Sequence, residues 1–377
     1  MLVTHLSLAD FRSWPLAELE FAPGVTTLTG RNGQGKTNLV EAIEYLATLS
    51  SHRVATDAPL IRFGSSRAIV RARVQAAVDD PRALALEIEI VAGRANKASL
   101  NRGPLRRPRD LLGALRVVLF SPEDLALVKG EPSDRRRFLD DLLTQRWPRL
   151  AGVRADYDRV LRQRSTLLKS FGGRRSDAAG AATLDVWDDQ LGRLGGELVH
   201  ARLRTLGDMA ADVAEAYSAI APTNNEARVD YKSSSLEGDW SEATPDELAE
   251  RLRTRMAERR GEEIARGVSL VGPHRDDLVL TLGPLPAKGY ASHGESWSFA
   301  LALRLGACAL LQVDGVEPVL ILDDVFAELD EVRRARLAQR IAGAEQVLIT
   351  AAVASDVPES LAGRRYRVGD GEVTLDE

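Results

Sequence analysis

Two short motifs near opposite ends of this 377-residue chain constrain its fold more than any other feature. The first, GRNGQGKT at residues 30–37, matches the phosphate-binding pattern G-x-x-x-x-G-K-[ST] at every fixed position. The second, PVLILDD at residues 318–324, is typical of a buried strand that carries two carboxylates at its end. Such a loop and such a carboxylate act on one nucleotide only when they lie side by side. The sequence therefore predicts an α/β fold whose nucleotide site is assembled from both ends of the chain.

The glycine-rich loop has the composition that an anion-binding backbone requires. Its glycines let successive N–H groups face a phosphate, and a β-branched strand at 25–29 and helical apolar spacing at 38–49 place it at a helix N-terminus. We expect Lys36 to contact the β- and γ-phosphates of ATP and Thr37 to ligate Mg²⁺. The other expected nucleotide contacts are Gly30, Arg31, Asn32, Gly33, Gln34, Gly35 and Asn38. The alternative, an accidental glycine-rich loop, does not explain these flanks.

The two carboxylates at the end of the second motif have separate expected roles. Asp323 is expected to bind Mg²⁺ through water, because Mg²⁺ is usually held by one or two carboxylates and substrate phosphates. Asp324 is expected to orient the attacking water, which makes Asp324 and Lys36 the predicted catalytic residues. The pattern alone also fits an ordinary strand that runs into a solvated turn, in which the two aspartates have no role at a nucleotide site.

A serine and a glycine precede a long apolar helix at residues 297–311. Ser292 and Gly294 are compatible with a plain helix start, and equally with a second anion-binding helix N-terminus. Their position upstream of the Asp-Asp strand resembles the signature motif of ABC-type ATPases. In those proteins the serine and glycine contact the γ-phosphate bound to the other subunit. Residues 327–330, which end in Asp330, resemble the D-loop that follows such a strand.

Across nearly its full length the chain resembles the RecF family of bacterial ABC- and SMC-like DNA repair ATPases. The segments that carry this resemblance are LSLADFRSW (6–14), SPEDL (121–125), SDRRRFLD (133–140) and GPHRDD (272–277). Glu295 stands where relatives often carry glutamine, and Asp324 stands where transporter ATPases have glutamate. An Asp-Asp pair is usual in RecF-like proteins, and the shorter acid is consistent with slow hydrolysis.

The resemblance implies an ABC-type P-loop ATPase head split by a mostly helical insertion, and therefore a two-lobed protein. It also implies a weak DNA-dependent ATPase that forms an ATP-dependent homodimer on duplex or gapped DNA and helps load RecA with RecR and RecO. Two other classes stay open: the ATPase subunit of an ABC transporter, and a DNA-independent P-loop kinase or regulatory NTPase. Transporter subunits rarely carry so long an insertion, and a kinase would leave Ser292 and Gly294 without a purpose.

Local patterns divide the chain into three regions. Residues 1–110 are expected to form the N-terminal part of the head, residues 111–265 the helical insertion and residues 266–377 the C-terminal part of the head. The predicted helices of the insertion span 134–143, 149–169, 184–217 and 245–264. The predicted strands include 69–74, 84–90, 278–282, 319–322 and 346–349.

Composition excludes several classes of protein. The single cysteine, Cys308, leaves no disulfide framework, and no apolar run approaches the ~20 residues that span a bilayer. With no signal-like start, a cytoplasmic protein without membrane contact is expected. The net charge is −5, so DNA binding would depend on local arginine clusters, at 102–109, 135–137 or 251–260. Such clusters suit backbone recognition of a duplex.

Three further residues have open roles. Thr350 follows a predicted strand at the position of a γ-phosphate sensor, or it simply ends the strand. Gln75 follows another predicted strand and is a candidate Mg²⁺ contact. His274 is either a pH-sensitive contact or a structural histidine whose hydrogen bonds are satisfied.

Overall fold

The computed structural model describes residues 1–172, 178–221, 226–312 and 315–376, which form two compact units. The first unit contains Met1–Lys129, Asp212–Ala227 and Leu282–Glu377, and the second contains Gly130–Ala211 and Arg228–Thr281. These boundaries differ from the predicted ones near residues 110 and 265. Strand β8 (Val117–Phe120) pairs with β12 (Val319–Asp323) in the sheet of the first unit, so the segment after residue 110 belongs to the head.

A six-stranded sheet brings the two nucleotide motifs to one edge. Its order is β15-β14-β3-β13-β12-β8, with β3 (Gly24–Thr29), β13 (Gln346–Ala351), β12 and β8 all parallel. Strand β14 (Arg364–Gly369) is parallel to β3, and β15 (Glu372–Asp376) is antiparallel to β14. Strands β12 and β13 are buried along their whole length and mostly apolar, as expected for parallel strands covered on both faces. Because β3 and β12 flank β13, the residues that follow them emerge at the same edge.

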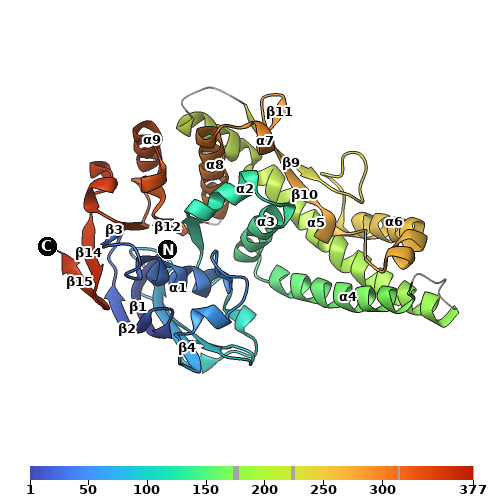
Figure 1. Ribbon diagram of the computed structural model, residues 1–377, viewed down its shortest axis with the longest axis horizontal. Coiled ribbons are helices and arrows are strands. Elements are labelled where there is room, and N and C mark those ends of the chain that lie inside the picture. The colour runs from blue at the N-terminus through green and yellow to red at the C-terminus, as the bar shows by residue number, and fades with distance from the viewer. Residues whose placement is uncertain (173–177, 222–225, 313–314, 377) are drawn as a thin grey trace. The chain divides into compact units, whose positions relative to one another are not determined.

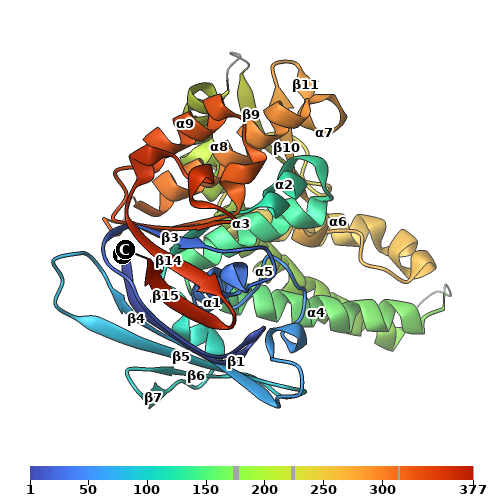
Figure 2. The ribbon, with the colours of Figure 1, turned by 60° about the vertical axis from the view of Figure 1, so that its left-hand side comes forward.

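A second, antiparallel sheet of the first unit has the order β2-β1-β4-β5-β6-β7. Its strands are β1 (Leu2–Phe11), β2 (Trp14–Glu20), β4 (Arg67–Gln75), β5 (Ala83–Val91), β6 (Lys97–Leu100) and β7 (Gly103–Pro104). Buried and exposed residues alternate along β4, as in a strand with one face on the core. Helix α1 (Lys36–Thr48) lies between the two sheets (Figure 2) and contacts strands of both. This position accounts for its nearly complete burial.

The remaining helices of the first unit are α2 (Leu125–Lys129), α7 (Ala287–Tyr290), α8 (His293–Gln312) and α9 (Glu331–Ile341), and the short strand β11 spans Leu285–Pro286. Between residues 297 and 311 of α8 the one charged residue is Arg304, whose guanidinium donates to Asp124 Oδ1 at 2.6 and 3.1 Å. Asp124 also accepts from the backbone N–H of Ser121 at 3.1 Å. The SPEDL segment therefore serves to neutralise a cation within the head.

Helices make up most of the second unit: α3 (Pro132–Arg146), α4 (Leu150–Ser170) and α6 (Pro245–Arg266), with most of the 43-residue α5 (Ala178–Ile220). Most residues of strands β9 (Ala227–Lys232) and β10 (Asp277–Leu282) also belong to it. Helices α4 and α5 run alongside each other (Figure 1), and residues of α4, α5 and α6 share a small apolar core. A Cβ atom at Gly196 of α5 would lie 2.5 Å from the Pro245 carbonyl oxygen, so this glycine permits close approach of α6.

Candidate nucleotide-binding site

The phosphate loop connects β3 to α1, and contacts within the chain leave no room for a side chain at two of its glycines, Gly30 and Gly35. A Cβ atom at Gly30 would lie 2.1 Å from the Val368 carbonyl oxygen. Gly35 has a φ of 94°, and a Cβ there would lie 2.8 Å from Ser13 Oγ and 2.9 Å from Trp14 Nε1. The Trp14 indole donates to the Gly35 carbonyl at 3.1 Å. Glycine at positions 30 and 35 therefore lets Val368, Ser13 and Trp14 pack directly against the loop backbone.

Lys36 lies against the inside of this loop, with its side chain almost fully buried. Its ammonium donates to the Gly30 carbonyl at 2.8 Å and lies 3.4 Å from both the Arg31 carbonyl and Asn32 Oδ1. Because a buried ammonium needs acceptors, these oxygens hold it in place. Phosphate oxygens offer the same ammonium stronger, charge-assisted bonds.

Asp323 joins the two motifs. Its Oδ1 accepts hydrogen bonds from Thr37 Oγ1 at 3.0 Å and from Thr350 Oγ1 at 2.6 Å. Thr350 Oγ1 in turn accepts from the backbone N–H of Asp324 at 2.9 Å, and Asp324 adopts a left-handed φ of 51°. Burial raises the pKa of Asp323 above its ordinary value, although the two threonine hydroxyls oppose the shift. A bound cation would stabilise the charged form of this carboxylate.

The oxygen ligands at this point suit Mg²⁺. A hydroxyl and a carboxylate, Thr37 and Asp323, are directly bonded to each other, and both are hard ligands of the kind that Mg²⁺ prefers. Within the described ranges there is no group of three His, Cys, Asp or Glu side chains that could hold a metal. A cation held partly by the protein and partly by substrate phosphates fits this arrangement.

His52 is a neighbour of Asp323 that sequence reasoning missed. Its Nδ1 is 2.6 Å from Glu44 Oε2, and its Nε2 is 3.8 Å from Asp323 Oδ2. Burial alone would lower the pKa of His52, but the hydrogen bond and charge of Glu44, with the charges of Asp323 and Glu123, raise it. A single histidine after a helix carries no sequence signal of this contact, because its partner is far along the chain.

The expected signature motif forms a capped helix start. Ser292 Oγ accepts from the backbone N–H of Glu295 at 3.2 Å, and Glu295 Oε2 accepts from the N–H of Ser292 at 2.8 Å. Glu295 thus completes a capping box with Ser292. Asp330 caps α9 in the same way, because its Oδ1 accepts from the N–H of Arg333 at 2.8 Å. The predicted site residues of the first unit therefore fall into two clusters. The first cluster holds the phosphate loop, Asp323 and Asp324, and the second cluster holds Ser292, Gly294 and Asp330, whose hydrogen bonds are separate from those of the first.

The structure separates Thr350 and Gln75, two of the three residues whose roles were open. Thr350 is the hydroxyl that bonds Asp323 and Asp324, so it does more than end a strand. Gln75 pairs with Leu2 at the first end of β1. The other end of β1, at Phe11, is the one that pairs with Trp14 and so lies near the phosphate loop. The register of β4 therefore does not bring Gln75 to the predicted Mg²⁺ site.

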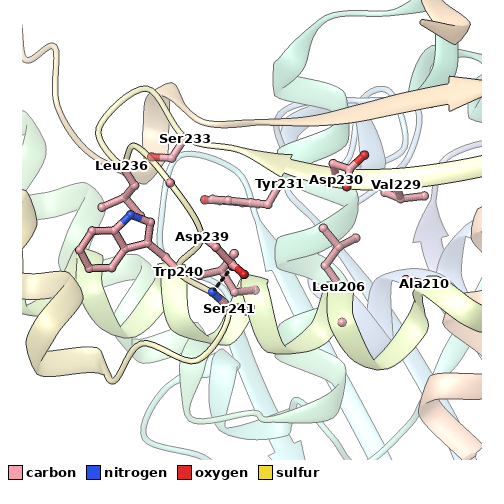
Figure 3. Close-up of a pocket in the computed structure, with 13 residues that line it drawn as sticks. Leu206, Ala210, Val229, Asp230, Tyr231, Ser233, Leu236, Asp239, Trp240 and Ser241 are labelled. Carbon is pink, nitrogen blue, oxygen red and sulfur yellow. Dashed lines mark hydrogen bonds between the residues drawn. The ribbon is translucent and has the colours of Figure 1, made fainter. Parts of the chain in front are cut away.

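Two cavities differ in their relation to these motifs. One, of about 510 Å³, is lined by Ser13 and Asn38 beside the loop, and by the fully exposed ring of Phe63. The other, of about 280 Å³, lies in the second unit between α5, β9 and the loop that carries Trp240 (Figure 3). None of the predicted nucleotide ligands lines the second cavity.

The three arginine clusters differ in how far they are neutralised. Carboxylates pair with most of the 251–260 cluster, through Arg253–Asp189, Arg255–Glu258, Arg259–Glu262 and Arg260–Asp185. Arg135 likewise binds Asp277 through two hydrogen bonds of 2.7 and 2.9 Å. In the 102–109 cluster only Arg107 has an ion pair among the described residues, with Asp110 at 3.4 Å. Arg102 and Arg106 are also exposed.

Comparisons with known proteins agree with this architecture. The model of the RecF/RecN/SMC N terminal domain matches residues 2–364. "DNA replication and repair protein RecF" of Cutibacterium acnes is 58% identical over 386 residues, which cover 99% of this chain and 98% of that protein. The RecF protein of Frankia alni is also 58% identical, over 99% of both chains.

Solved structures agree as well. Structures of the recombination mediator protein RecF with ATP and with ATPrS in the RecFOR pathway align over 100% of this chain, with a TM-score of 0.89 and 26% identity. The alignment covers 97% of the RecF chain solved with ATP and 98% of the RecF chain solved with ATPrS. No helix in the described ranges is both long and apolar enough to cross a membrane. The fold is that of a RecF- and SMC-like ABC ATPase head with a helical insertion, and the chain belongs to the RecF family.

Proposed function

We propose that this protein is an ATP-dependent DNA-binding protein of recombinational DNA repair, with weak DNA-dependent ATPase activity. The observation that carries the proposal is the hydrogen bond between Thr37 and Asp323, which joins the phosphate loop to the Asp-Asp strand. Relatives named for DNA replication and repair, and the RecF structure with ATP, support the same function.

Each residue of the first cluster has a defined role in this proposal. The loop N–H groups of residues 30–38 and Lys36 bind the phosphates of ATP, and Thr37 and Asp323 hold Mg²⁺, Asp323 through water. The metal would neutralise charge on the phosphates. Asp324, just beyond Asp323, orients the attacking water, and its backbone is held by Thr350. The cavity lined by Ser13, Asn38 and Phe63 accommodates the nucleoside part.

The second cluster completes the site of another copy. Ser292, Gly294 and Asp330 contact ATP that is bound to a second subunit, so ATP is required to join two heads. Helix α8 supports this role, because its N-terminus carries the positive end of a 20-residue helix dipole. ATP binding then produces a homodimer, and hydrolysis releases it.

DNA is held through its backbone in this proposal. The 102–109 cluster supplies the contact, because Arg102, Arg106 and Arg109 have no carboxylate ion pair among the described residues and are available to phosphates. The preferred DNA is duplex or gapped, and RecR and RecO are the partners with which the dimer helps load RecA. Structures named for the RecFOR pathway support this assignment.

The proposal is tested by ATP hydrolysis measured with and without duplex DNA, with lipid vesicles as a control. Stimulation by DNA and not by vesicles is expected. A turnover that duplex DNA leaves unchanged would contradict a DNA-dependent ATPase. Stimulation by vesicles alone would favour a transporter subunit instead.

A further inference from the structure

Arg333 connects the two elements that the proposed function places against a partner's ATP. It lies in the first turn of α9, and its Nε donates to Ser298 Oγ in α8 at 2.9 Å. Its Nη1 forms an ion pair with Asp330, the cap of its own helix. Ser298 Oγ also donates to the Gly294 carbonyl at 3.0 Å. One guanidinium thus spans from the D-loop residue to the first turn of the signature helix.

The same guanidinium occupies the space beside Gly294 that a side chain would need. A Cβ atom on Gly294 would lie 2.6 Å from Arg333 Nη2 and 2.9 Å from its Cζ. The Arg333 side chain is 12% exposed and Ser298 is fully buried, so the guanidinium has little room to withdraw. The absence of a side chain at 294 therefore lets the planar fork lie across the helix start.

Arginine suits this position for a physical reason. Its guanidinium is always charged and presents donors in a fixed plane, so one side chain holds two partners in a defined relative orientation. The two partners here are the carboxylate of Asp330 and the hydroxyl of Ser298, on different helices. Lysine has the charge but not the fork. The hydrogen bonds and the ion pair of Arg333 within the described residues are with Ser298 and Asp330, and its charge also acts on Tyr217 of α5; none of these partners belongs to the phosphate loop or is Asp323.

We propose that Arg333 is a positioning residue for the half of the ATP site that acts on the partner subunit. It locks the start of α8 at Gly294, and with it the helix cap Ser292, to Asp330, so that the signature and D-loop residues meet the second copy's nucleotide as one rigid surface. This inference rests on the proposed function, because it requires ATP to join two heads. It predicts that Arg333 contributes to dimerisation and turnover but not to ATP binding by the same subunit.

The first test compares nucleotide binding with dimerisation. Arg333→Met should bind ATP with parental affinity by calorimetry, yet form the ATP-dependent dimer at least about tenfold more weakly, since the charged hydrogen bonds that fix Gly294 and Asp330 relative to each other are lost. Arg333→Lys should share most of the defect. Arg340→Met is the matched control, because Arg340 lies on the same helix and pairs with the exposed Glu215. It should dimerise as the parent does.

The second test mixes subunits that carry different substitutions. Arg333→Met mixed with Lys36→Met leaves one composite site with both defects and one intact, so hydrolysis should partly recover. Arg333→Met mixed with Ser292→Arg places a defect in both sites, so hydrolysis should stay low. The pair Lys36→Met with Ser292→Arg sets the level of recovery that one intact site permits.

The outcomes separate the inference from the proposed function. A parental protein that does not dimerise with ATP would refute the proposed function itself. If the parent dimerises and folded Arg333→Met or Arg333→Lys dimerises equally well, Arg333 is not a positioning residue. Loss of ATP affinity in both variants, or recovery with Ser292→Arg but not with Lys36→Met, would assign Arg333 to its own subunit's site and overturn the inference.

Discussion

Thr37 and Asp323 share a hydrogen bond of 3.0 Å although 286 positions separate them in the chain. The sheet order explains the contact, since β3 and β12 lie on either side of β13 and all three run in the same direction. Thr350, at the end of the middle strand, bonds the same oxygen of Asp323. The first cluster is therefore built from three parallel strand ends, and each can be altered separately.

Lys36→Met should abolish measurable ATP binding, because no other ammonium among the described loop residues replaces the one inside the loop. Isothermal titration calorimetry gives the affinity directly. Lys97→Met is a suitable control, since Lys97 is exposed and pairs with Glu89 on β5. Unchanged affinity in Lys36→Met would remove the nucleotide assignment of the loop.

Asp324→Asn should retain Mg²⁺-ATP but lower turnover by about 100-fold or more, because asparagine keeps the size and loses the charge that orients water. The ATP-dependent dimer should then persist. Size-exclusion chromatography with ATP, alongside steady-state hydrolysis, measures both effects. Turnover at the parental rate would show that Asp324 does not act on water.

Thr350→Val should destabilise the protein by about 1–3 kcal/mol, because it leaves the Asp324 N–H without its acceptor and removes one of the two hydroxyls that donate to Asp323 Oδ1. It should also raise the Mg²⁺ concentration needed for hydrolysis. Thr26→Val is the matched control, since the buried Thr26 hydroxyl on β3 has no hydrogen-bond partner among the described residues. Urea denaturation should show Thr26→Val to be neutral or stabilising.

DNA affinity should fall log-linearly with salt, with a slope of about 0.9 for each phosphate contacted. Replacing Arg102, Arg106 and Arg109 by glutamine should reduce that slope by up to about 3 units, with little dependence on DNA sequence. Replacing Arg253, Arg255 and Arg259 should change it less, because carboxylates already neutralise them. Fluorescence anisotropy over a salt series measures the slopes. An unchanged slope in the first triple variant would exclude that cluster.

His274 should make the second unit sensitive to acid. Burial lowers the pKa of His274 to about 4, with nearby Arg275, Arg136 and Arg164 acting in the same direction. Tyr157 OH is 2.7 Å from its Nδ1, and the Ser269 carbonyl is 3.3 Å from its Nε2. Between pH about 6.5 and 4 the unfolded chain binds a proton that the folded chain does not, so stability should fall as pH falls.

The expected loss from this one group is on the order of 3 kcal/mol across that range of pH. Urea denaturation at a series of pH values, for the parent and His274→Gln, measures it as a difference. His5→Gln, in the first unit, controls for loss of a histidine elsewhere. Equal acid dependence in the parent and in His274→Gln would contradict a neutral, buried His274.

Local sequence patterns determined the elements of this protein and the chemistry at their ends. Helices predicted at 149–169 and 245–264 are α4 (Leu150–Ser170) and α6 (Pro245–Arg266), and the strand predicted at 319–322 is β12. These agree because periodicity and capping act between residues that are close in the chain. The phosphate loop and the Asp-Asp pair could also be recognised in the sequence, since each is a contiguous motif.

The tertiary structure decided which residues far apart in the chain contact one another. It placed β8 in the head sheet, brought His52 to Asp323 and laid Arg333 across Gly294. It also decided which arginines remain available to bind DNA phosphates. Arg253 and Arg260 form ion pairs with carboxylates on α5, whereas Arg102 has no ion pair within the described chain. Such partners are chosen by packing and strand order, which no local pattern records, so a free cation and a neutralised one have the same appearance in the sequence.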